Sequence, residues 1–224
     1  KKKEGFLKII SIFSFLGIML GVAILIIVMS VMNGFKTDLT KKILGLNPHI
    51  VIQSNSYKIN DAYISKLKSE FKNMSFSRSF SGEGIIISNN NAKGIILKGV
   101  NKQEKKIQEF FENFSSNGDI NNFDANEVFI GSELAFNLNL KKGDSLSIMS
   151  SAFVATPLGS LPKQENFNVA GIFNTGFLDF DQNVIFLNIQ DALSILDKEK
   201  KDQNIEIYLK DPLKADLYKN KIQK

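Results

Sequence analysis

The feature that most constrains this chain is a run of 27 residues, 9–35, without a single charged side chain. As a helix rising about 1.5 Å per residue, the run would reach roughly 40 Å, more than the ~30 Å hydrocarbon core of a bilayer requires. A secretory signal peptide usually has an apolar stretch of only about 7–15 residues that ends at a small-residue cleavage site. The segment Asn33–Gly34–Phe35–Lys36 offers no such site. The run therefore predicts a retained transmembrane helix over residues 9–35.

Basic residues flank this run on both sides. Four lysines lie in residues 1–8 and three in residues 36–42, and the first group stands closer to the apolar run. The positive-inside bias therefore favours a cytoplasmic flank at 1–8 and a large domain outside, at 36–224. The chain has no initiator Met and stops in a charged, helix-like stretch, so we expect a fragment of a longer protein.

Net charge limits the possible partners of the large domain. The whole chain carries +5, and residues 1–8 hold four Lys and one Glu, or +3, which leaves +2 for the remainder. A domain this close to neutral is a poor electrostatic partner for nucleic acid, which requires a clustered basic face. We therefore predict no nucleic-acid binding.

The residues that usually carry catalysis are scarce. His49 is the only histidine and there is no cysteine, which excludes a plausible zinc or thiol site. No Gly-rich phosphate loop with a Lys-Ser/Thr ending is present, so the chain should not hydrolyse nucleotide itself. The acidic pairs Asp119/Asp124 and Asp179/Asp181 lack calcium-loop spacing and are better interpreted as solvated turns. We predict no catalytic residue, metal or cofactor of its own.

Beyond Pro48, short strands and short helices alternate, which predicts an α+β domain. The expected strands are 49–53, 76–80, 84–88, 94–100, 127–130, 145–149, 167–173, 183–188 and 204–209. The expected helices begin at Asp61 and after Pro212, and cover 102–114, 132–138 and 189–196. Asn89–Asn91 reads as a turn, and residues 113–126, rich in Asn, Ser and Asp, read as a loop and possible subdomain seam.

Small and polar residues mark the apolar run. Ser14, Gly17 and Gly21 share one helix face, and such a stripe lets a neighbouring helix approach closely in lipid. The alternative is chance, because glycine is common in membrane helices. Ser30 and Asn33 place polar groups near the outer end, where they either face a cavity or mark the membrane interface.

A second conspicuous segment, residues 151–166, links two expected antiparallel strands. Hairpin loops usually have about 2–5 residues, so one of about 16 tends to carry function or to be disordered. This segment contains four large apolar residues, which disordered segments avoid, and Pro157 and Pro162 limit its backbone freedom. It predicts a stiff, apolar-tipped projection that docks another protein, the alternative being a loop folded onto its own domain.

Several runs of residues resemble one family. They are 16–22, 29–35, 43–48, 142–144, 156–162, 167–171 and 211–214, of which Ser-Val-Met-Asn-Gly-Phe at 30–35 is quite specific. With these runs the chain resembles the permease subunits of lipoprotein-releasing ABC transporters, the LolC/LolE/LolF family. The resemblance implies a bacterial inner-membrane permease with four transmembrane helices and a MacB-like periplasmic domain between the first two. This chain would hold the first helix and most of that domain.

The resemblance also implies partners and a division of the domain. The expected partners are a cytoplasmic ATPase that binds ATP, a second permease subunit, a LolA-like periplasmic carrier, the lipoprotein cargo and membrane lipid. The first subdomain would comprise about 47–112 and 203–224, and the second, about 113–202, would carry a hook loop at 151–166. The first helix, with Ser14, Gly17, Gly21, Ser30 and Asn33, would line a cavity for the cargo's acyl chains.

The family's carrier-binding residues map onto the hook loop. The hook would comprise Thr156, Pro157, Leu158, Gly159, Leu161 and Pro162, with Leu158 as its apolar contact. Gln164 would lie on a pad at its base. Two pad positions that are arginine in the family are Ser147 and Glu165 here. Either other charges, such as Lys163, hold the carrier, or this dock is weaker.

Two alternatives remain open. One is a signal-anchored periplasmic adaptor that recruits a partner and transports nothing. The other is a MacB- or FtsX-type permease of similar topology, with other cargo and without this hook. Three further apolar spans in the full-length protein would favour a permease over the adaptor.

Overall fold

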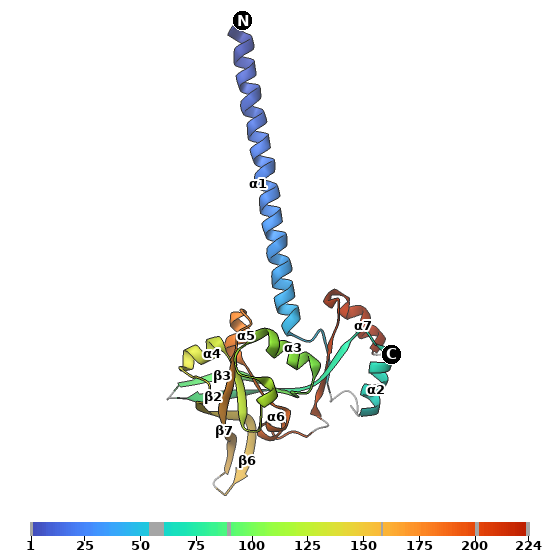
Figure 1. Ribbon diagram of the computed structural model, residues 1–224, viewed down its shortest axis with the longest axis vertical. Helices are drawn as coiled ribbons and strands as arrows, with labels where there is room; N and C mark the ends of the chain where they lie inside the picture. Colours follow the sequence, from blue (N-terminus) through green and yellow to red (C-terminus); the bar gives the residue numbers. More distant parts are fainter. Residues whose placement is uncertain (1, 54–60, 89–90, 158, 200–201, 223–224) are drawn as a thin grey trace. The chain divides into compact units, whose positions relative to one another are not determined.

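The computed structural model describes residues 2–53, 61–88, 91–157, 159–199 and 202–222. The chain divides into two compact units, Lys1–Gly45 and Leu46–Lys224 (Figure 1). Each unit is described by itself below. Leu158, the predicted apolar contact of the hook, lies outside the described residues.

The first unit consists of the helix α1, which runs over Lys2–Leu46. Its segment Lys8–Thr37 is long and apolar enough to cross a membrane, with a mean hydropathy of 2.9. The helix expected over 9–35 is therefore present and continues at both ends. At its polar end, the Thr37 hydroxyl donates to the Asn33 carbonyl at 2.8 Å, which satisfies the side chain within the helix.

The second unit mixes strands and short helices, as expected for an α+β domain. Its strands are β1 (Ile50–Ile52), β2 (Ser75–Ser88), β3 (Asn91–Val100), β4 (Ser115–Asn117), β5 (Glu127–Gly131), β6 (Ser145–Thr156), β7 (Gly159–Phe173), β8 (Val184–Asn188) and β9 (Asn204–Tyr208). Its α-helices are α2 (Asp61–Glu70), α3 (Lys105–Phe114), α4 (Ser132–Leu138), α5 (Leu178–Asn183), α6 (Ile189–Ile195) and α7 (Ala215–Ile222). The described residues also include the short 3₁₀ turns η2 (Ile120–Asn122) and η4 (Pro212–Lys214).

Most strands close into a barrel. β2 pairs with β3, β3 with β8, β8 with β5, β5 with β7 and β7 with β6, and β6 returns to pair with β2. The β3–β8 and β5–β7 pairs are parallel, and the other pairs of this ring are antiparallel. Closure removes the open edges that a sheet would otherwise expose.

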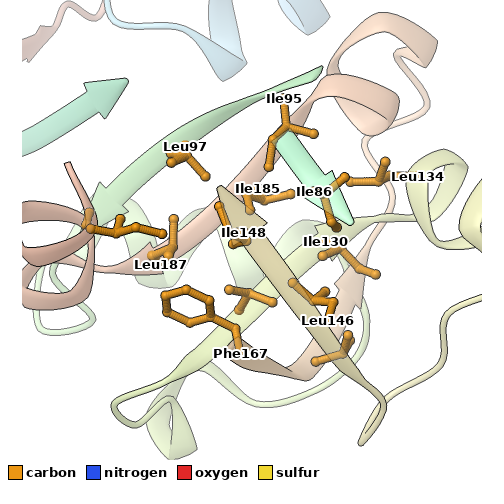
Figure 2. Close-up of a cluster of buried hydrophobic side chains, with 14 of the residues drawn as sticks. Ile86, Ile95, Leu97, Ile130, Leu134, Leu146, Ile148, Phe167, Ile185 and Leu187 are labelled. Carbon is orange, nitrogen blue, oxygen red and sulfur yellow. The ribbon is translucent and has the colours of Figure 1, made fainter. Parts of the chain in front are cut away.

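Alternation along the barrel strands separates two apolar clusters. Val128 and Ile130 of β5 face the barrel core, whereas Phe129 faces outward. Figure 2 shows the inner cluster, to which β2, β3, β6, β7 and β8 also contribute. Outside the barrel, α3 places Phe111 against Phe129, with ring centroids 4.6 Å apart. Phe111, Phe129 and several other phenylalanines thus build a layer between the barrel wall and α3.

A smaller sheet joins the barrel through β2. The first part of β2, Ser75–Ser79, pairs antiparallel with β9, and β9 pairs antiparallel with β1. Helices α2 and α7 pack on one face of this sheet, where Ile64 and Leu67 meet Ile205 and Ile207. The sheet therefore has an apolar cluster of its own. The subdomain boundaries at 113 and 203 stay a prediction.

The sequence prediction of separate strands at 76–80 and 84–88 was wrong. β2 runs unbroken through Ser88, because Ser81–Glu83 pair with β3. Gly82, between the two expected strands, lies in close contact with Leu196: an added Cβ would come within 2.6 Å of that side chain. The glycine therefore serves packing and not a turn. Of the expected turn at Asn89–Asn91, residues 89–90 lie outside the described residues, and Asn91 begins β3.

Two further expectations needed correction. Residues 113–126 are not a plain loop, because they hold β4 and η2 and bury Ile120 and Phe123. Helix α5 was not expected at all. This helix positions the buried carboxylate of Asp181. The carboxylate accepts hydrogen bonds from the backbone N–H groups of Thr175 and Gly176 and from the Thr175 hydroxyl.

Candidate functional site: the β6–β7 hairpin

Residues 151–166 form a two-stranded ribbon, which corrects the expected 16-residue loop. β6 and β7 continue their antiparallel pairing through Phe153 opposite Pro162 and Val154 opposite Leu161, as far as Thr156 opposite Gly159. β6 ends at Thr156, and β7 begins at Gly159. Pro162 lies in a part of β7 that pairs with β6 alone among the described residues, and an edge strand tolerates a missing N–H. We call residues 151–166 the hook hairpin.

Local chemistry closes the end of the hook hairpin. The Thr156 hydroxyl donates to the Gly159 carbonyl at 2.7 Å. Gly159 has φ +120°, a backbone conformation that side-chain-bearing residues rarely adopt. The turn thus depends on these two residues, which the sequence placed correctly at the end of the projection.

The hook hairpin exposes apolar side chains on both of its faces. Phe153 is 63% exposed and shares one face with Pro162, while Val154 (46%) and Leu161 (53%) share the other. In Figure 1 the ends of β6 and β7 extend away from the barrel. The alternative of a loop folded down on its own domain is therefore wrong.

The apolar surface continues onto the barrel wall. Ile85, Ile96 and Met149, together with Pro162, line a groove of about 630 Å³. Gln164 lies on the same side as Met149, its register partner, and donates to the Ser147 hydroxyl at 2.7 Å. The structure thus brings the predicted pad residue Gln164 into hydrogen-bond contact with Ser147, another predicted pad position.

Helix α6 holds the base of the hook hairpin. The buried Ser150 hydroxyl donates to the Ile195 carbonyl at 2.6 Å. Lys163 Nζ donates to the Ser194 carbonyl at 2.7 Å and lies 3.2 Å from a Glu165 carboxylate oxygen. Lys163, considered from the sequence as a substitute cation for docking, is therefore engaged within the domain. Sequence reasoning missed the contribution of Ser150 and Ser194, since their contacts join strands to a helix distant in the chain.

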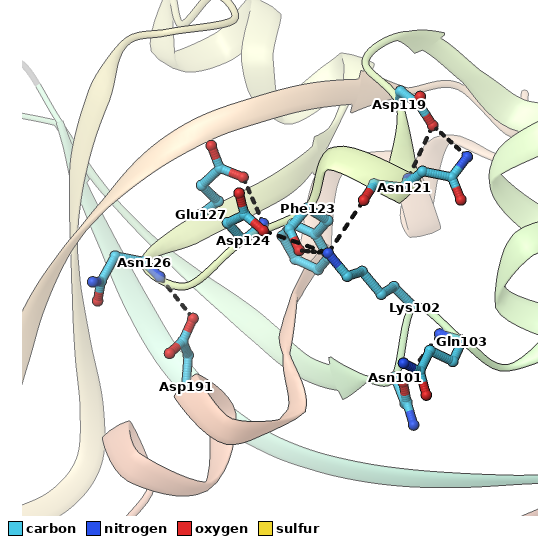
Figure 3. Close-up of polar contacts among 10 residues, drawn as sticks. All are labelled: Asn101, Lys102, Gln103, Asp119, Asn121, Phe123, Asp124, Asn126, Glu127 and Asp191. Carbon is cyan, nitrogen blue, oxygen red and sulfur yellow. Dashed lines mark hydrogen bonds and ion pairs between the residues drawn. The ribbon is translucent and has the colours of Figure 1, made fainter.

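The acidic residues of 119–127 are used in local structure (Figure 3). Asp119 caps η2 by accepting from the Asn121 backbone N–H at 2.9 Å. Lys102 Nζ binds the Phe123 carbonyl at 2.9 Å and lies 3.4 Å from Asp124. No group of metal-ligating side chains occurs in the part of the chain that the structure describes. The interpretation of these acids as turn residues is consistent with this geometry.

Asp191 links the same segment to α6. Its carboxylate accepts from the Asn126 backbone N–H at 2.8 Å, as Figure 3 shows. Burial raises the pKa of Asp191, an effect that this hydrogen bond opposes and the nearby Glu165 carboxylate adds to. Asp191 and Glu165 thus place two acidic groups near the hairpin base. The surface here differs in charge from the expected pad.

The remaining candidate residues lie in the helical unit. Ser14, Gly17 and Gly21 fall on one face of α1 by their spacing, and an added Cβ at Gly17 or Gly21 would meet no atom within 4 Å. Ser30 and Asn33 are likewise exposed along α1. Their roles in helix packing or in a lipid cavity stay predictions.

Comparison with known proteins gives the chain its family. The family model "MacB-like periplasmic core domain" matches residues 11–224. A lipoprotein-releasing system transmembrane protein LolC from Neisseria meningitidis serogroup B is 26% identical, with 96% of this chain and 53% of that protein covered. The LolC of Buchnera aphidicola subsp. Schizaphis graminum is 30% identical, with 97% and 55% covered. The periplasmic region of MacB from Actinobacillus actinomycetemcomitans superposes with a TM-score of 0.43 at 13% identity, covering 71% of this chain and 70% of that one.

These relatives confirm the predicted resemblance to LolC and LolE proteins. The chain spans about half the length of the curated relatives it matches. The matched family model covers nearly all of the chain, including most of α1 and the whole of the second unit. The chain belongs to the MacB-like periplasmic core domain family.

Proposed function

We propose that this chain is part of a permease subunit of a lipoprotein-releasing ABC transporter in the bacterial inner membrane. Its hook hairpin would hold a periplasmic carrier that receives the lipoprotein. The observation that carries the proposal is the projecting ribbon with Phe153, Val154 and Leu161 exposed on its two faces. The similarity to lipoprotein-releasing system transmembrane proteins supports the same function.

The physical problem of lipoprotein release explains why such a hairpin is useful. Moving an acyl chain from lipid into water costs about 0.8 kcal/mol per CH₂ group. A lipoprotein with several acyl chains would not leave the membrane unaided, so release needs an energy source and an apolar receiving pocket. The chain has no phosphate-binding loop, and the energy would come from a separate cytoplasmic ATPase. A carrier held by the hook hairpin would supply the pocket.

The hook hairpin is built to bind with a small entropic cost. Its tip is closed by the Thr156–Gly159 hydrogen bond, and its base is fixed to α6 through Ser150 and Lys163. A preorganised surface loses less conformational entropy when a partner binds, so more of the apolar contact energy remains as affinity. The predicted contacts are Thr156, Pro157, Leu158, Gly159, Leu161 and Pro162, with Gln164 at the base.

Helix α1 would have a separate role in the membrane. The stripe Ser14, Gly17 and Gly21 would pack against a helix of a second permease subunit, since small residues allow close approach in lipid. Ser30 and Asn33 would face the cavity that takes the cargo. A bulky substitution such as Gly17→Leu should weaken assembly of the complex. Unaltered assembly and release would count against this role.

The carrier-binding role is tested on the full-length protein in its complex. Leu158→Glu and Leu161→Glu each place a charge on the hook hairpin and should abolish co-purification of the carrier while partner ATPase activity persists. The matched control is Leu213→Glu, at a position that is 83% exposed but lies on η4. Carrier binding that survives both hairpin substitutions would refute the role.

A MacB-type permease with other cargo is the second candidate, favoured by the matched family model. It would share the domain but need no lipoprotein carrier. Lipoprotein release from spheroplasts depleted of the full-length protein separates the two: accumulation of lipoproteins in the inner membrane supports the first function. Normal release with defective export of another substrate supports the second.

A further inference from the structure

The groove at the base of the hook hairpin lies on the outer wall of the barrel. Along β2, Ile86 belongs to the inner cluster of Figure 2, so its neighbours Ile85 and Ile87 point outward. Ile85 is 41% exposed, and its register partners are Gly94 on β3 and Met149 on β6. A row of apolar and small residues therefore crosses three strands on the outside of the barrel.

The residue in the β3 position of this row has no side chain. An added Cβ at Gly94 would meet no atom within 4 Å, so this part of the wall is open. Two residues farther along β3, Ile96 is 45% exposed on the same side. The groove of about 630 Å³ has the size of a small-molecule site, about 300–1,000 Å³. Contiguous exposed apolar surface of this kind marks interaction sites and ligand grooves.

The groove is continuous with the hook hairpin. Pro162 lines the groove and lies opposite Phe153, an exposed residue of the hairpin. Between Met149 and Phe153 the register of β6 against β7 shifts, and a β-bulge of this kind bends the strand. The shift lies where the hook hairpin leaves the barrel. One apolar surface therefore runs from the barrel wall onto the hairpin.

The groove offers few hydrogen-bond partners to a peptide. At Gly84 and Ile85, β2 pairs with β3 on one side and with β6 on the other, so both of its edges are occupied there. Two polar residues of the lining, Ser150 and Asn183, donate to backbone carbonyls of the domain itself. A peptide lying in the groove would bury backbone N–H and C=O groups without partners, which is unfavourable.

A saturated acyl chain carries no such groups. Its transfer from water to an apolar groove is favourable in proportion to the apolar area that is covered. Glu83 and Ser151, the remaining polar residues of the lining, are exposed and can stay hydrated beside a bound chain. The lining therefore favours an acyl chain over a polypeptide segment.

We propose that this groove binds an acyl chain of a lipoprotein on its way to the carrier, an inference that rests on the proposed function. The chain would lie across β2, β3 and β6 against Ile85, Ile96 and Met149. Phe153 and Pro162 would continue the apolar surface toward a carrier held by the hook hairpin. The groove would thus shorten the path over which the acyl chain is exposed to water.

Photolabelling of the full-length protein in lipid nanodiscs tests the proposal. The probe is a synthetic triacylated lipopeptide with a diazirine in one acyl chain, added without carrier and without ATP. Illumination should label residues 83–96 and 149–162. It should also label the apolar segment of α1, which would lie in the lipid and serves as the positive control.

Two substitutions should remove the groove signal. Ile85→Glu and Ile96→Glu should each lower labelling of the two segments about tenfold, because a carboxylate resists desolvation by an apolar chain. Both side chains are exposed, so neither change removes a core residue. The matched control is Phe136→Glu, at a position on α4 that is 83% exposed and outside the groove, and it should leave labelling unchanged.

Three results would overturn the proposal. The first is labelling of α1 without labelling of the groove. The second is equal groove labelling by a non-acylated peptide of the same sequence with the diazirine on the peptide, which would assign the groove to polypeptide. The third is equal groove labelling by a phospholipid with a diazirine in its acyl chain, which would assign it to membrane lipid. Since carrier and ATP are absent, these results are independent of whether Leu161→Glu abolishes carrier binding.

Discussion

β6 and β7 differ sharply between their two halves. Near the barrel, Leu146, Ile148 and Phe167 are buried, whereas Phe153 and Leu161 farther along the same strands are exposed. The residue types and the pairing pattern are similar in both halves. What differs is the neighbourhood: β2 pairs with β6 at Ser147–Ser150 and not beyond, and α6 reaches only the base. Apolar side chains on paired strands become core only where further elements cover them.

The largest change in the free energy of unfolding should come from removing an aromatic ring at the barrel end of β7. Phe167 is 1% exposed, so Phe167→Ala should lower the free energy of unfolding by about 3–5 kcal/mol through lost burial and a cavity. The matched variant Phe153→Ala, on the exposed half, should change it by less than about 1 kcal/mol. Denaturant unfolding of the chain in detergent measures both, and equal losses would show that the hook hairpin is part of the core.

Two ion pairs, one buried and one more exposed, allow the same comparison of covered and exposed regions. Lys98 and Glu206 form a buried pair at 3.1 Å between β3 and β9, and Tyr208 donates to Glu206 at 2.6 Å. Lys98→Met should destabilise the domain by about 3 kcal/mol, because it leaves a buried carboxylate without its cation. Lys163→Met at the hairpin base breaks a more exposed pair and should cost under about 1 kcal/mol. A small loss for Lys98→Met would indicate that Glu206 is hydrated or protonated.

The buried barrel strands were largely predictable from the sequence, whereas the exposed half of β6 and β7 was not. Val128, Phe129 and Ile130 predict a strand, because a short apolar run of residues with high β propensity has few other stable conformations. Residues 151–166 were expected to be a loop, because the strands predicted on either side ended at Met149 and began at Phe167. The placement of the projection was right, but its ribbon form was not. Ser150 and Ser194 escaped notice because their hydrogen bonds depend on tertiary contact and leave no local pattern.

A substitution in the turn of the hook hairpin should weaken the hairpin without destabilising the barrel. Gly159 has φ +120°, so Gly159→Ala forces a side chain into a conformation that costs about 1–3 kcal/mol. The hairpin tip can relieve this strain by opening, and the global free energy of unfolding should change by less than about 0.5 kcal/mol. Amide exchange near Thr156 should accelerate and carrier binding should weaken. A global loss above 1 kcal/mol would show that the tip and barrel unfold together.

The smallest effect concerns pH at the edge of β2. Burial raises the pKa of Glu104 above its ordinary 4.5, although hydrogen bonds from Ser77 and Arg78 oppose this. The folded state therefore holds this proton more tightly than the unfolded state does. The resulting stability is full below about pH 4.5 and is lost as pH rises through the folded pKa.

Glu104→Gln should consequently flatten the fall of the unfolding free energy as the pH rises above about 4.5. Glu133→Gln, a half-buried carboxylate on α4, serves as the control. If Glu104→Gln leaves the pH dependence of the unfolding free energy unchanged, the Glu104 carboxyl titrates alike in the folded and unfolded states.

The length of β2 has a mechanical consequence. One unbroken strand of 14 residues is shared by the barrel and the smaller sheet, with β9 bonded to its first part and β6 to its second. Sliding one sheet against the other would require rupture of backbone hydrogen bonds. The barrel and the smaller sheet should therefore move as one rigid body. A displacement of β9 is therefore transmitted through β2 to the barrel end of β6 without passing through any loop.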